Sequence, residues 1–385
     1  MPRVLHIITR LTLGGAQETA LYYFHHLERE KFDVFFMAGT QFEFQEEAVL
    51  EALWKDANFT CIKNLDNRIH PIKDLLSIWE IYKGIKRNKI DIVHTHSAKA
   101  GFVGRVAARL AKVSVIIHTV HGWSFNPLMK PLIKKIYIFL EKLMAKCTTQ
   151  LIVVSNPDIE KGLAHGIGRL NQYKVIRSGI DFTKFTILNE KDILRFKENF
   201  PGKRLIGAVG RLSAPKNYRD FVKIAKELCR RREDLHFVIV GEGELRAEIE
   251  EYISQNKLKD KVTLLGLRRD VNLILRSLDV LLLPSLWEGL PRVLPEAMYC
   301  ELPIVANRVD GVEEIIIDGF NGLLVAPKDC LGAVASVEKL LENFEFSQRL
   351  VENAKQGVYE YSAQKMIEDT QNLYRELYGR FGGGE

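Results

Sequence analysis

The sequence predicts an α/β protein of two doubly wound domains, each a parallel sheet with helices on both faces. Three observations lead to this fold class. Short runs of Val, Ile and Leu alternate with longer stretches of helical spacing along the whole chain. These runs are apolar on both faces, which is typical of parallel strands buried beneath right-handed crossover helices. The chain of 385 residues also exceeds what one hydrophobic core usually supports, so two domains are expected.

The apolar runs give the expected strands in chain order. They lie at residues 4–8, 34–37, 90–93, 115–117 and 151–154 in the first half, and at 205–209, 237–240, 262–265, 280–283, 304–305 and 323–325 in the second. Helical spacing follows the runs, beginning with residues 17–27 and ending with residues 362–378. We therefore expect an N-terminal domain over residues 1–180, a C-terminal domain over 181–361, and a helix within 362–385 that packs back on the N-terminal domain.

The composition excludes several classes of protein. Apolar residues make up 46% of the chain and charged residues 27%, the usage of a globular protein rather than a disordered or fibrous one. The five cysteines are scattered without a CxxC pair, so neither a zinc clip nor a disulfide framework is expected. No window holds the roughly 18 uninterrupted apolar residues that a membrane span requires. We expect a soluble or peripheral protein in a reducing compartment, the cytoplasm.

The positive charge is concentrated in the first half of the chain. The net charge is +6, but residues 1–180 carry +9 and residues 181–385 carry −3. Residues 81–150 alone carry +11. This concentration of charge predicts a basic face on the first half of the chain. That face could meet a phospholipid surface, a nucleic acid or a phosphorylated substrate, or it could simply be solvated.

A glycine turn follows the first expected strand. Gly14 and Gly15 stand between that strand and the helix over residues 17–27. Adjacent glycines let backbone amides approach an anion without obstruction by Cβ, and the helix dipole favours negative charge there. The turn is therefore either a phosphate seat or a tight turn that needs glycine for its backbone angles. It lacks the GxGxxG fingerprint, as do residues 241–246, which weakens an NAD-binding interpretation.

Two cations lie on the loop after the strand at residues 205–209. Arg211 and Lys216 are five positions apart on this loop, which leads into a helix. Both could reach one bound diphosphate, the arginine as a planar fork and the lysine as a point charge. The pair is interpreted either as a stabiliser of a leaving diphosphate or as solvated loop charge.

Two carboxylates follow the end of the expected strand at residues 280–283. Glu288 follows the apolar strand at residues 280–283, and Glu296 comes eight positions later on the following helix. Carboxylates in these places can accept hydrogen bonds from hydroxyl groups. The amides of Gly289 and Leu290, expected at the helix start, remain available for an anion. The spacing favours a ligand with hydroxyl-rich groups on both sides of a phosphate.

Taken together, these motifs make the sequence similar to the retaining, nucleotide-sugar-dependent glycosyltransferases of family 4. The resemblance covers residues 1 to about 330 in family order, with the terminal helix also in place. It implies the GT-B architecture, in which two Rossmann-like domains face each other across an interdomain cleft, and a nucleoside-diphosphate sugar donor, expected to be a UDP-sugar. The matching features are the GG turn, HTHSAKAGFVGRVAA, VHG, the GRL-to-lysine loop, VGEGELR, PSLWEGLPRVLPEAM with its E-x7-E spacing, and VDGVEEIIIDGFNGLLV.

The resemblance also implies catalytic roles. Gly15, next to Gly14, would offer its backbone amide to the donor diphosphate. Arg211 and Lys216 would neutralise that diphosphate as it departs, and Glu288 would lie near the hydroxyls of the transferred sugar. The histidine of the VHG triplet, His121, would approach the donor sugar from the acceptor side.

The remaining implied roles concern donor binding. The amides of Gly289 and Leu290 would contact the distal phosphate, and Glu296 would hold the ribose hydroxyls. The nucleobase would rest mainly against backbone atoms, at Gly266, Leu267 and Arg268.

We expect no metal cofactor. Fixed cations and helix N-termini can stabilise a departing diphosphate, and the chain has no DxD triplet of the kind that holds the ion in metal-dependent transferases of the other major fold. An alternative remains in the histidines at two strand ends, which could form a zinc site. They are His94, His96, His118 and His121.

The acceptor is inferred from the basic first half. Residues 125–146 combine Leu, Ile, Phe and Tyr with five lysines, the composition of a helix on anionic lipid or of a helix that covers the sheet with its lysines in solvent. The stretch HTVHGWSF resembles transferases of bacterial polysaccharide assembly. This resemblance implies a lipid-linked or glycan acceptor in cell-envelope polysaccharide synthesis at the inner face of the membrane. Two other functions stay open: a sugar-nucleotide epimerase of the UDP-N-acetylglucosamine 2-epimerase type, and a non-enzymatic basic protein that binds nucleic acid.

Overall fold

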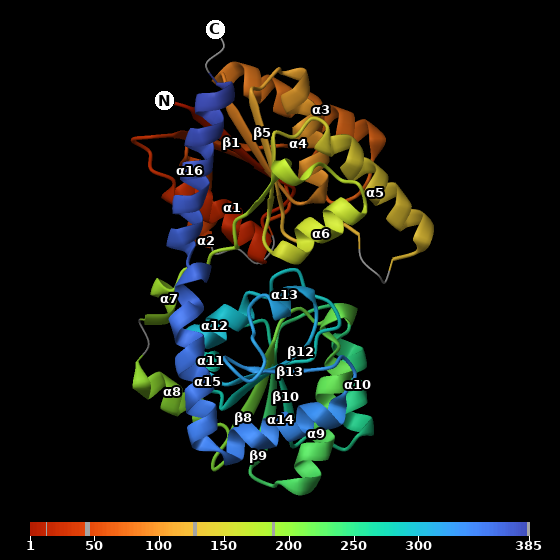
Figure 1. The fold of residues 1–385 in the computed structure, drawn as a ribbon, viewed down its shortest axis with the longest axis vertical. Helices are drawn as coiled ribbons and strands as arrows, with labels where there is room; N and C mark the ends of the chain where they lie inside the picture. Colours follow the sequence, from red (N-terminus) through yellow and green to blue (C-terminus); the bar gives the residue numbers. More distant parts are fainter. Residues whose placement is uncertain (13, 43–46, 126–128, 187–188, 383–385) are drawn as a thin grey trace. The chain divides into compact units, whose positions relative to one another are not determined.

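The computed structural model describes residues 1–12, 14–42, 47–125, 129–186 and 189–382. The chain forms two compact units, the first made of Met1–Gly179 with Ala363–Glu385 and the second of Ile180–Ser362. In each unit, helices cover a parallel sheet (Figure 1). The predicted fold class is confirmed.

Parallel strands form the seven-stranded sheet of the first unit in the order β3-β2-β1-β4-β5-β6-β7. They span Arg3–Ile8 (β1), Asp33–Ala38 (β2), Phe59–Cys61 (β3), Ile92–His96 (β4), Val115–Val120 (β5), Gln150–Val153 (β6) and Tyr173–Val175 (β7). The predicted runs are the central strands, although the run expected at 90–93 begins two residues later. The sequence does not predict the edge strands β3 and β7, because each has only three residues and is partly exposed.

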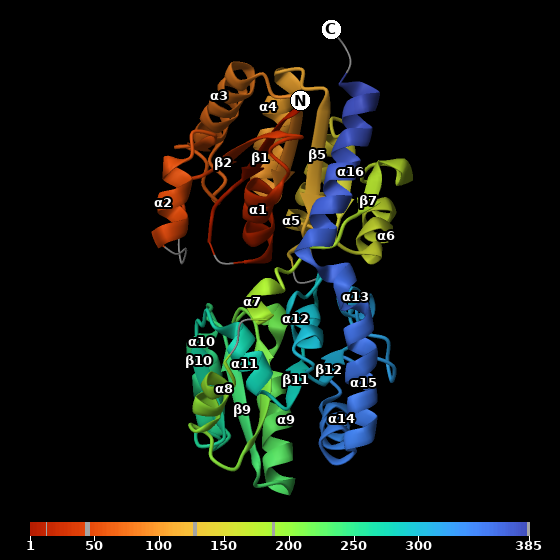
Figure 2. The same ribbon diagram turned by 90° about the vertical axis from the view of Figure 1, so that its left-hand side faces the viewer.

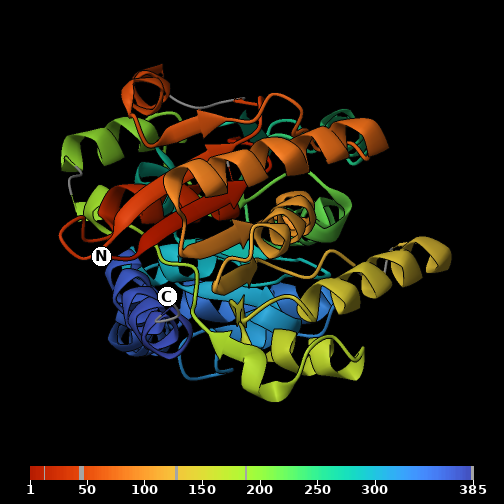
Figure 3. The ribbon, with the colours of Figure 1, turned by 90° about the horizontal axis from the view of Figure 1, so that it is seen from above.

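Helices cover both faces of this first sheet. They span Gly15–His26 (α1), Glu47–Lys55 (α2), Pro71–Asn88 (α3), Ala98–Leu110 (α4), Pro131–Ala145 (α5), Asn156–Ala164 (α6) and Ala363–Phe381 (α16). α3 and α4 pack over the face that carries Leu5 and Val93, whereas α1 and α16 pack over the face that carries Val4 and Ile117. Figure 3 shows the strands of this unit between α3 (orange) and α16 (blue). Within the described ranges, no helix has both the length and the apolar character that crossing a bilayer requires.

The last helix, α16, belongs to the first unit. Its apolar stripe places Met366 and Tyr374 in the same core as residues of α1. Thr370 Oγ1 donates a hydrogen bond to Tyr23 Oη of α1 at 3.0 Å. α16 also runs alongside β5 (Figure 2). Helix α16 therefore packs against α1 and over β5 of the first sheet.

The second unit has a six-stranded parallel sheet in the order β10-β9-β8-β11-β12-β13. Its strands span Arg204–Val209 (β8), Leu235–Val240 (β9), Val262–Gly266 (β10), Val280–Leu283 (β11), Ile304–Asn307 (β12) and Leu323–Val325 (β13). Each run predicted in this half corresponds to one of these strands. The strand order reverses between β8 and β11, as it does between β1 and β4 in the first unit, and ligands of open parallel sheets bind at such switch points.

Helices again cover both faces of the second sheet. They span Thr183–Thr186 (α7), Glu190–Lys197 (α8), Tyr218–Arg231 (α9), Arg246–Gln255 (α10), Val271–Ser277 (α11), Val293–Tyr299 (α12), Asp310–Glu313 (α13), Cys330–Glu342 (α14) and Phe344–Gly357 (α15). α9, α10 and α14 pack over one face, and α11 and α12 over the other. The fully apolar β11, buried between these layers, ends directly before the loop that carries Glu288.

Candidate functional site

Two loops are joined at the switch point of the second unit. Leu286 N, after β11, donates to the carbonyl oxygen of Pro215, after β8, at 2.7 Å. Asn217 Nδ2 donates to the carbonyl oxygen of Pro284 at 3.2 Å, and Asn307 Nδ2, at the end of β12, donates to the same oxygen at 2.8 Å. Three strand ends therefore fix the loop at residues 284–292.

Lys216 and Glu288 meet across these loops. Lys216 Nζ lies 2.6 Å from Glu288 Oε1, and Ser285 Oγ donates to the same oxygen at 2.6 Å. The side chains of Lys216 and Glu288 are 20% and 10% exposed, so the pair is largely shielded from water. A charge-assisted hydrogen bond in such a place is short and strong. A fixed cation and a fixed carboxylate lie side by side at the switch point, which suits a ligand with both phosphate and hydroxyl groups.

The structure does not bring Arg211 to this pair. Its guanidinium contacts Glu244 Oε2 instead, with Nη2 at 3.0 Å and Nε at 3.2 Å. The two side chains are 65% and 55% exposed, and such a solvated pair contributes about 0–1 kcal/mol. Arg211 can therefore leave Glu244 at little cost, and it must do so to share an anion with Lys216.

Gly311, in the short helix α13 after β12, lets that helix approach the loop that carries Glu288. A Cβ at Gly311 would lie 1.5 Å from the carbonyl oxygen of Gly289, so no larger residue fits without moving the backbone. Sequence reasoning includes Gly311 only as part of a longer motif, and it misses Asn307 altogether. The available signal was their place at the carboxyl end of an apolar strand.

The structure places Gly289 and Leu290 in the loop rather than in the first turn of α12. The helix begins at Val293, so their expected position at the helix start is corrected. Glu296 lies on α12 and is partly buried. Glu288 and Glu296 thus occupy a loop and the helix after it, as their spacing predicts.

The predicted nucleobase site lies at the end of β10, two strands from β8. Gly266 adopts a left-handed conformation with φ of +69°, and Leu267 is 41% exposed. Arg268 binds Asp270 through two hydrogen bonds of 2.8 and 2.5 Å, and these bonds lower the pKa of the Asp270 carboxyl. Both residues line a surface groove of about 920 Å³ with Phe196 of α8. Neither Lys216 nor Glu288 lines that groove.

In the first unit, the glycine turn opens α1. Gly14 is the N-cap, which makes no side-chain hydrogen bond, and Gly15 is the first residue of the helix. Glu18 N donates to the carbonyl oxygen of Gly14 at 3.0 Å. The amides before Glu18 have no acceptor within the helix and can take an anion.

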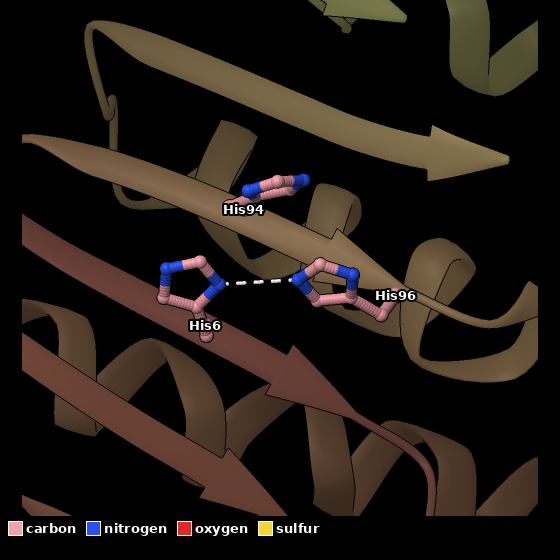
Figure 4. Close-up of side chains that lie close together, drawn as sticks. All are labelled: His6, His94 and His96. Carbon is pink, nitrogen blue, oxygen red and sulfur yellow. Dashed lines mark hydrogen bonds between the residues drawn. The ribbon is translucent and has the colours of Figure 1, made fainter. Parts of the chain in front are cut away.

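His121 directly follows β5 and is half-buried. Its Nε2 lies 3.2 Å from His96 Nδ1, and its Nδ1 lies 3.5 Å from Ser178 Oγ. His96 Nε2 lies in turn 3.1 Å from His6 Nδ1 (Figure 4). His121 therefore stands at the border of a histidine cluster on β1 and β4.

Strand alternation builds this cluster. His6 pairs with His94 in the register of β1 and β4, and His96 pairs with Thr119 in the register of β4 and β5. Because alternate residues of a strand share a face, these side chains all lie beneath α1 and α16. Burial lowers the pKa of His6 to about 3 and holds the pKa of His94 and His96 well below the usual range. The three imidazoles are neutral at physiological pH.

The grouping behind the zinc alternative is corrected. His118 lies on the opposite face of the sheet, where its Nδ1 is 2.9 Å from Thr95 Oγ1. In the described part of the chain, the histidines whose ring nitrogens gather within metal-binding reach are His6, His94 and His96. Sequence reasoning misses His6, because one histidine within an apolar run signals nothing until its neighbours in the sheet are known.

Two protein-family models match most of the chain. Residues 13–184 match Glycosyltransferase Family 4, and residues 190–357 match Glycosyl transferases group 1. The two matches meet near the boundary between the two structural units.

Curated relatives carry names of bacterial glycosyltransferases. The UDP-Gal:alpha-D-GlcNAc-diphosphoundecaprenol alpha-1,3-galactosyltransferase of Escherichia coli is 35% identical over 338 residues, which cover 85% of this chain and 84% of that protein. The GalNAc-alpha-(1->4)-GalNAc-alpha-(1->3)-diNAcBac-PP-undecaprenol alpha-1,4-N-acetyl-D-galactosaminyltransferase of Campylobacter jejuni is 27% identical and covers 98% of this chain and 99% of its own length.

Solved structures share the fold at low sequence identity. Anabaena HepE in complex with UDP and glucose superposes with a TM-score of 0.83 at 18% identity, covering 98% of this chain and 100% of that one. Sucrose-phosphate synthase from Thermosynechococcus elongatus gives a TM-score of 0.81 at 18% identity, covering 99% and 100%. This chain belongs to the family 4 glycosyltransferases and has their GT-B fold.

Proposed function

We propose that this glycosyltransferase moves a hexose, with retention of configuration, from a UDP-sugar to a lipid-linked or glycan acceptor in cell-envelope polysaccharide synthesis. The observation that carries the proposal is the shielded pair of Lys216 and Glu288 at the switch point of the second unit. The UDP-sugar and diphosphoundecaprenol in the name of the E. coli relative support the choice of donor and acceptor. The epimerase and nucleic-acid alternatives gain no support from the relatives.

The proposed reaction is stabilised by charged side chains of the protein, which hold the site's charge before the bond to the sugar breaks. As the bond between sugar and diphosphate breaks, negative charge grows on the phosphate and positive charge on the sugar ring. Lys216 stabilises the negative charge on the phosphate. Arg211 leaves Glu244 and then contacts the same phosphate. Glu288 accepts hydrogen bonds from sugar hydroxyls and faces the positive ring. Groups held in place before the reaction need little reorganisation, which is why such electrostatic stabilisation is usually the largest catalytic term.

The other candidate residues complete the proposed donor site. Amides of Gly289 and Leu290 bind the distal phosphate, and Glu296 binds the ribose. In the first unit, His121 meets the donor sugar and the first-turn amides of α1 meet the diphosphate. Gly14 and Gly15 form the turn before α1. Gly266, Leu267 and Arg268 form the proposed nucleobase site at the end of β10.

Transfer that depends on an acceptor tests this function. A panel of nucleotide sugars is first screened for a rise in melting temperature, because a ligand that binds only the folded state stabilises it. The stabilising donor is then incubated with and without a polyprenyl-diphosphate sugar. We expect a new glycolipid only when acceptor is present. An epimer of the donor formed without acceptor would contradict the proposal and favour the epimerase.

We further propose that turnover needs no metal ion, since Lys216, Arg211 and backbone amides supply the positive charge. Activity is expected to remain largely unchanged after dialysis against EDTA. The measurement is the initial rate of glycolipid formation in chelated enzyme, with and without added Mg²⁺ or Mn²⁺. Complete loss with EDTA that a divalent ion restores would refute this part of the mechanism.

Helix α5 supports a membrane-bound acceptor. Along one face of this helix, Leu132, Ile136 and Phe139 are 71%, 51% and 64% exposed. Lys135 and Lys142 lie on the same helix among these apolar residues. An exposed apolar stripe with lysines is the pattern of a helix that lies at an anionic bilayer surface. We propose that α5 brings the first unit to the membrane that holds the acceptor.

The double substitution Ile136→Glu with Phe139→Glu is expected to abolish binding to vesicles that contain phosphatidylglycerol. The charges replace the apolar contact and repel the anionic lipid. Vesicle co-sedimentation measures the effect. As a matched control, Leu194→Glu changes an apolar residue of the second unit that is 63% exposed, and binding should stay unchanged. Equal binding by all three proteins would remove α5 from the proposal.

A further inference from the structure

A continuous row of hydrogen bonds crosses the face of the first sheet beneath α16. It links imidazoles from β1, from β4 and from the residue after β5 to a phenol from the last helix, with a hydroxyl group at each end. In order along the row, the residues are Thr119, His94, Tyr374, His6, His96, His121 and Ser178.

The links around Tyr374 begin the row. Thr119 Oγ1 lies 2.6 Å from His94 Nε2, and His94 Nδ1 lies 2.5 Å from Tyr374 Oη. Tyr374 Oη also lies 3.4 Å from His6 Nε2. A side chain of α16 therefore bridges two histidines that strand register alone does not connect by hydrogen bonds.

The second half of the row leads outward to His121. His6 Nδ1 lies 3.1 Å from His96 Nε2, and the two rings lie nearly parallel (Figure 4). His96 Nδ1 lies 3.2 Å from His121 Nε2. The last link, from His121 Nδ1 to Ser178 Oγ, is the longest at 3.5 Å. His121 is thus the last imidazole of the row and is half-buried, whereas His6, His94 and His96 are fully buried.

The tautomers of the imidazoles in this row depend on one another, because each hydrogen bond needs one donor and one acceptor. A neutral imidazole has one N–H donor and one acceptor nitrogen, and burial keeps His6, His94 and His96 neutral. The Arg29 cation near His6 lowers its pKa further. Each nitrogen of these rings contacts a neighbour in the row, so a donor at one nitrogen requires an acceptor at the other. The row can therefore run in either of two directions, but its members do not choose independently.

Thr119 decides between the directions. Its buried hydroxyl has one proton to donate, and within the described residues its Oγ1 has no partner other than His94 Nε2. If His94 Nε2 carried the proton, the Thr119 proton would be buried without an acceptor, which is costly. Thr119 therefore donates, His94 Nε2 accepts, and His94 carries its proton on Nδ1.

We propose that Thr119 and Tyr374 are positioning residues that set the tautomer of His121 through this row. His94 Nδ1–H donates to Tyr374 Oη, whose hydroxyl donates to His6 Nε2. The same order continues through His96 and places the His121 proton on Nδ1. His121 Nε2 accepts from His96 and is unavailable as a base.

The catalytic consequence rests on the proposed function. If His121 meets the donor sugar, it does so as an Nδ1–H donor toward a sugar oxygen, in the direction now taken by Ser178 Oγ. The C-terminal helix then contributes to the reaction through Tyr374, although it does not touch the substrate.

A metal ion on the same histidines is the competing explanation. The ring nitrogens of His6, His94 and His96 gather closely enough to act as ligands. However, each of them already has a protein hydrogen-bond partner, and the set contains no carboxylate to balance a divalent charge. The hydrogen-bonded row satisfies these buried groups without an ion.

The tautomers are directly measurable. Protein labelled with ¹⁵N-histidine gives a two-bond ¹H–¹⁵N spectrum in which Nδ1–H and Nε2–H imidazoles differ. We expect the Nδ1–H form for His6, His94, His96 and His121 in the full-length protein. An Nε2–H form at His121 would overturn the proposal, as would one equivalent of Zn²⁺ retained by these histidines after dialysis.

Matched variants at Thr119 separate positioning from structure. Thr119→Val keeps the side-chain shape but removes the donor, so the direction of the row is released and His121 should show mixed tautomers. Turnover should fall roughly tenfold with little change in KM, the scale of one misplaced hydrogen bond. Thr119→Ser restores the hydroxyl and should restore both readouts. Tyr374→Phe breaks the row at its centre and should resemble Thr119→Val.

The two proposals can fail separately. The spectrum needs no substrate, so Nδ1–H tautomers in a protein without transferase activity would support the row and refute the function. Conversely, active enzyme whose His121 tautomer is the same in the wild type and in Thr119→Val would refute the row and leave the function intact.

Discussion

Alanine at Lys216 or at Glu288 is expected to lower turnover by about two orders of magnitude or more, the scale of losing one electrostatic partner of a transition state. Lys216→Ala removes the cation that meets the diphosphate and leaves Glu288, held by Ser285 Oγ, without its counter-charge. Glu288→Ala removes the carboxylate and frees Lys216 from its fixed position. Initial rates at saturating donor measure both effects, and circular dichroism checks the fold.

Arg219→Ala is the matched control for this pair. Arg219 binds Glu248 on the surface of the same unit at 2.8 Å, with side chains 58% and 45% exposed. Because a solvated ion pair contributes little, its loss should leave turnover unchanged. Near-normal turnover in both Lys216→Ala and Glu288→Ala would contradict the proposed site, whereas equal losses in all three variants would indicate a general effect of charge.

Glu141→Ala is expected to destabilise the first unit strongly. Arg105 of α4 is 1% exposed, and its Nη2 lies 3.0 Å from Glu141 Oε2 of α5. Within the described residues, Arg105 Nη1 already lacks a hydrogen-bond partner. Removing the carboxylate would leave a buried guanidinium uncompensated, which typically costs about 3–5 kcal/mol. The free energy of unfolding in urea measures the loss.

Two further variants show whether the loss of stability comes from the unpaired buried charge. Arg105→Met with Glu141→Leu replaces both charges by apolar side chains and should recover much of the stability, because no unpaired charge remains. Glu51→Ala breaks an exposed pair with Lys55, whose side chains are 61% and 78% exposed, and should change stability by less than about 1 kcal/mol. If Glu141→Ala were as mild as Glu51→Ala, the buried pair would not be what fastens α5 to α4.

The strand pattern was predictable because a strand that is buried on both faces consists mainly of apolar residues. The apolar runs at residues 205–209, 237–240 and 280–283 lie in β8, β9 and β11, and each ends where a loop with charged residues begins. β3 and β7 were not predictable in this way, since edge strands with exposed residues need no apolar run. The loop position of Glu288 and the helical position of Glu296 follow from the same pattern.

Contacts between distant side chains were less predictable. The sequence places Arg211 and Lys216 on one loop, but only packing shows that Lys216 meets Glu288 while Arg211 turns to Glu244. Gly311 is equally uninformative until its approach to the Gly289 carbonyl is seen. These contacts depend on how the loops and the short helix that follow different strands come together.

The sequence alone determined the two parallel-sheet domains, the family, and the strand ends at which charged and glycine residues lie, because hydrophobic period and motif spacing are local properties of the chain. Tertiary structure decided which of those residues touch. His6, His96 and Tyr374 are far apart in sequence, and only strand register and the docking of α16 on the first unit bring their polar atoms into one row.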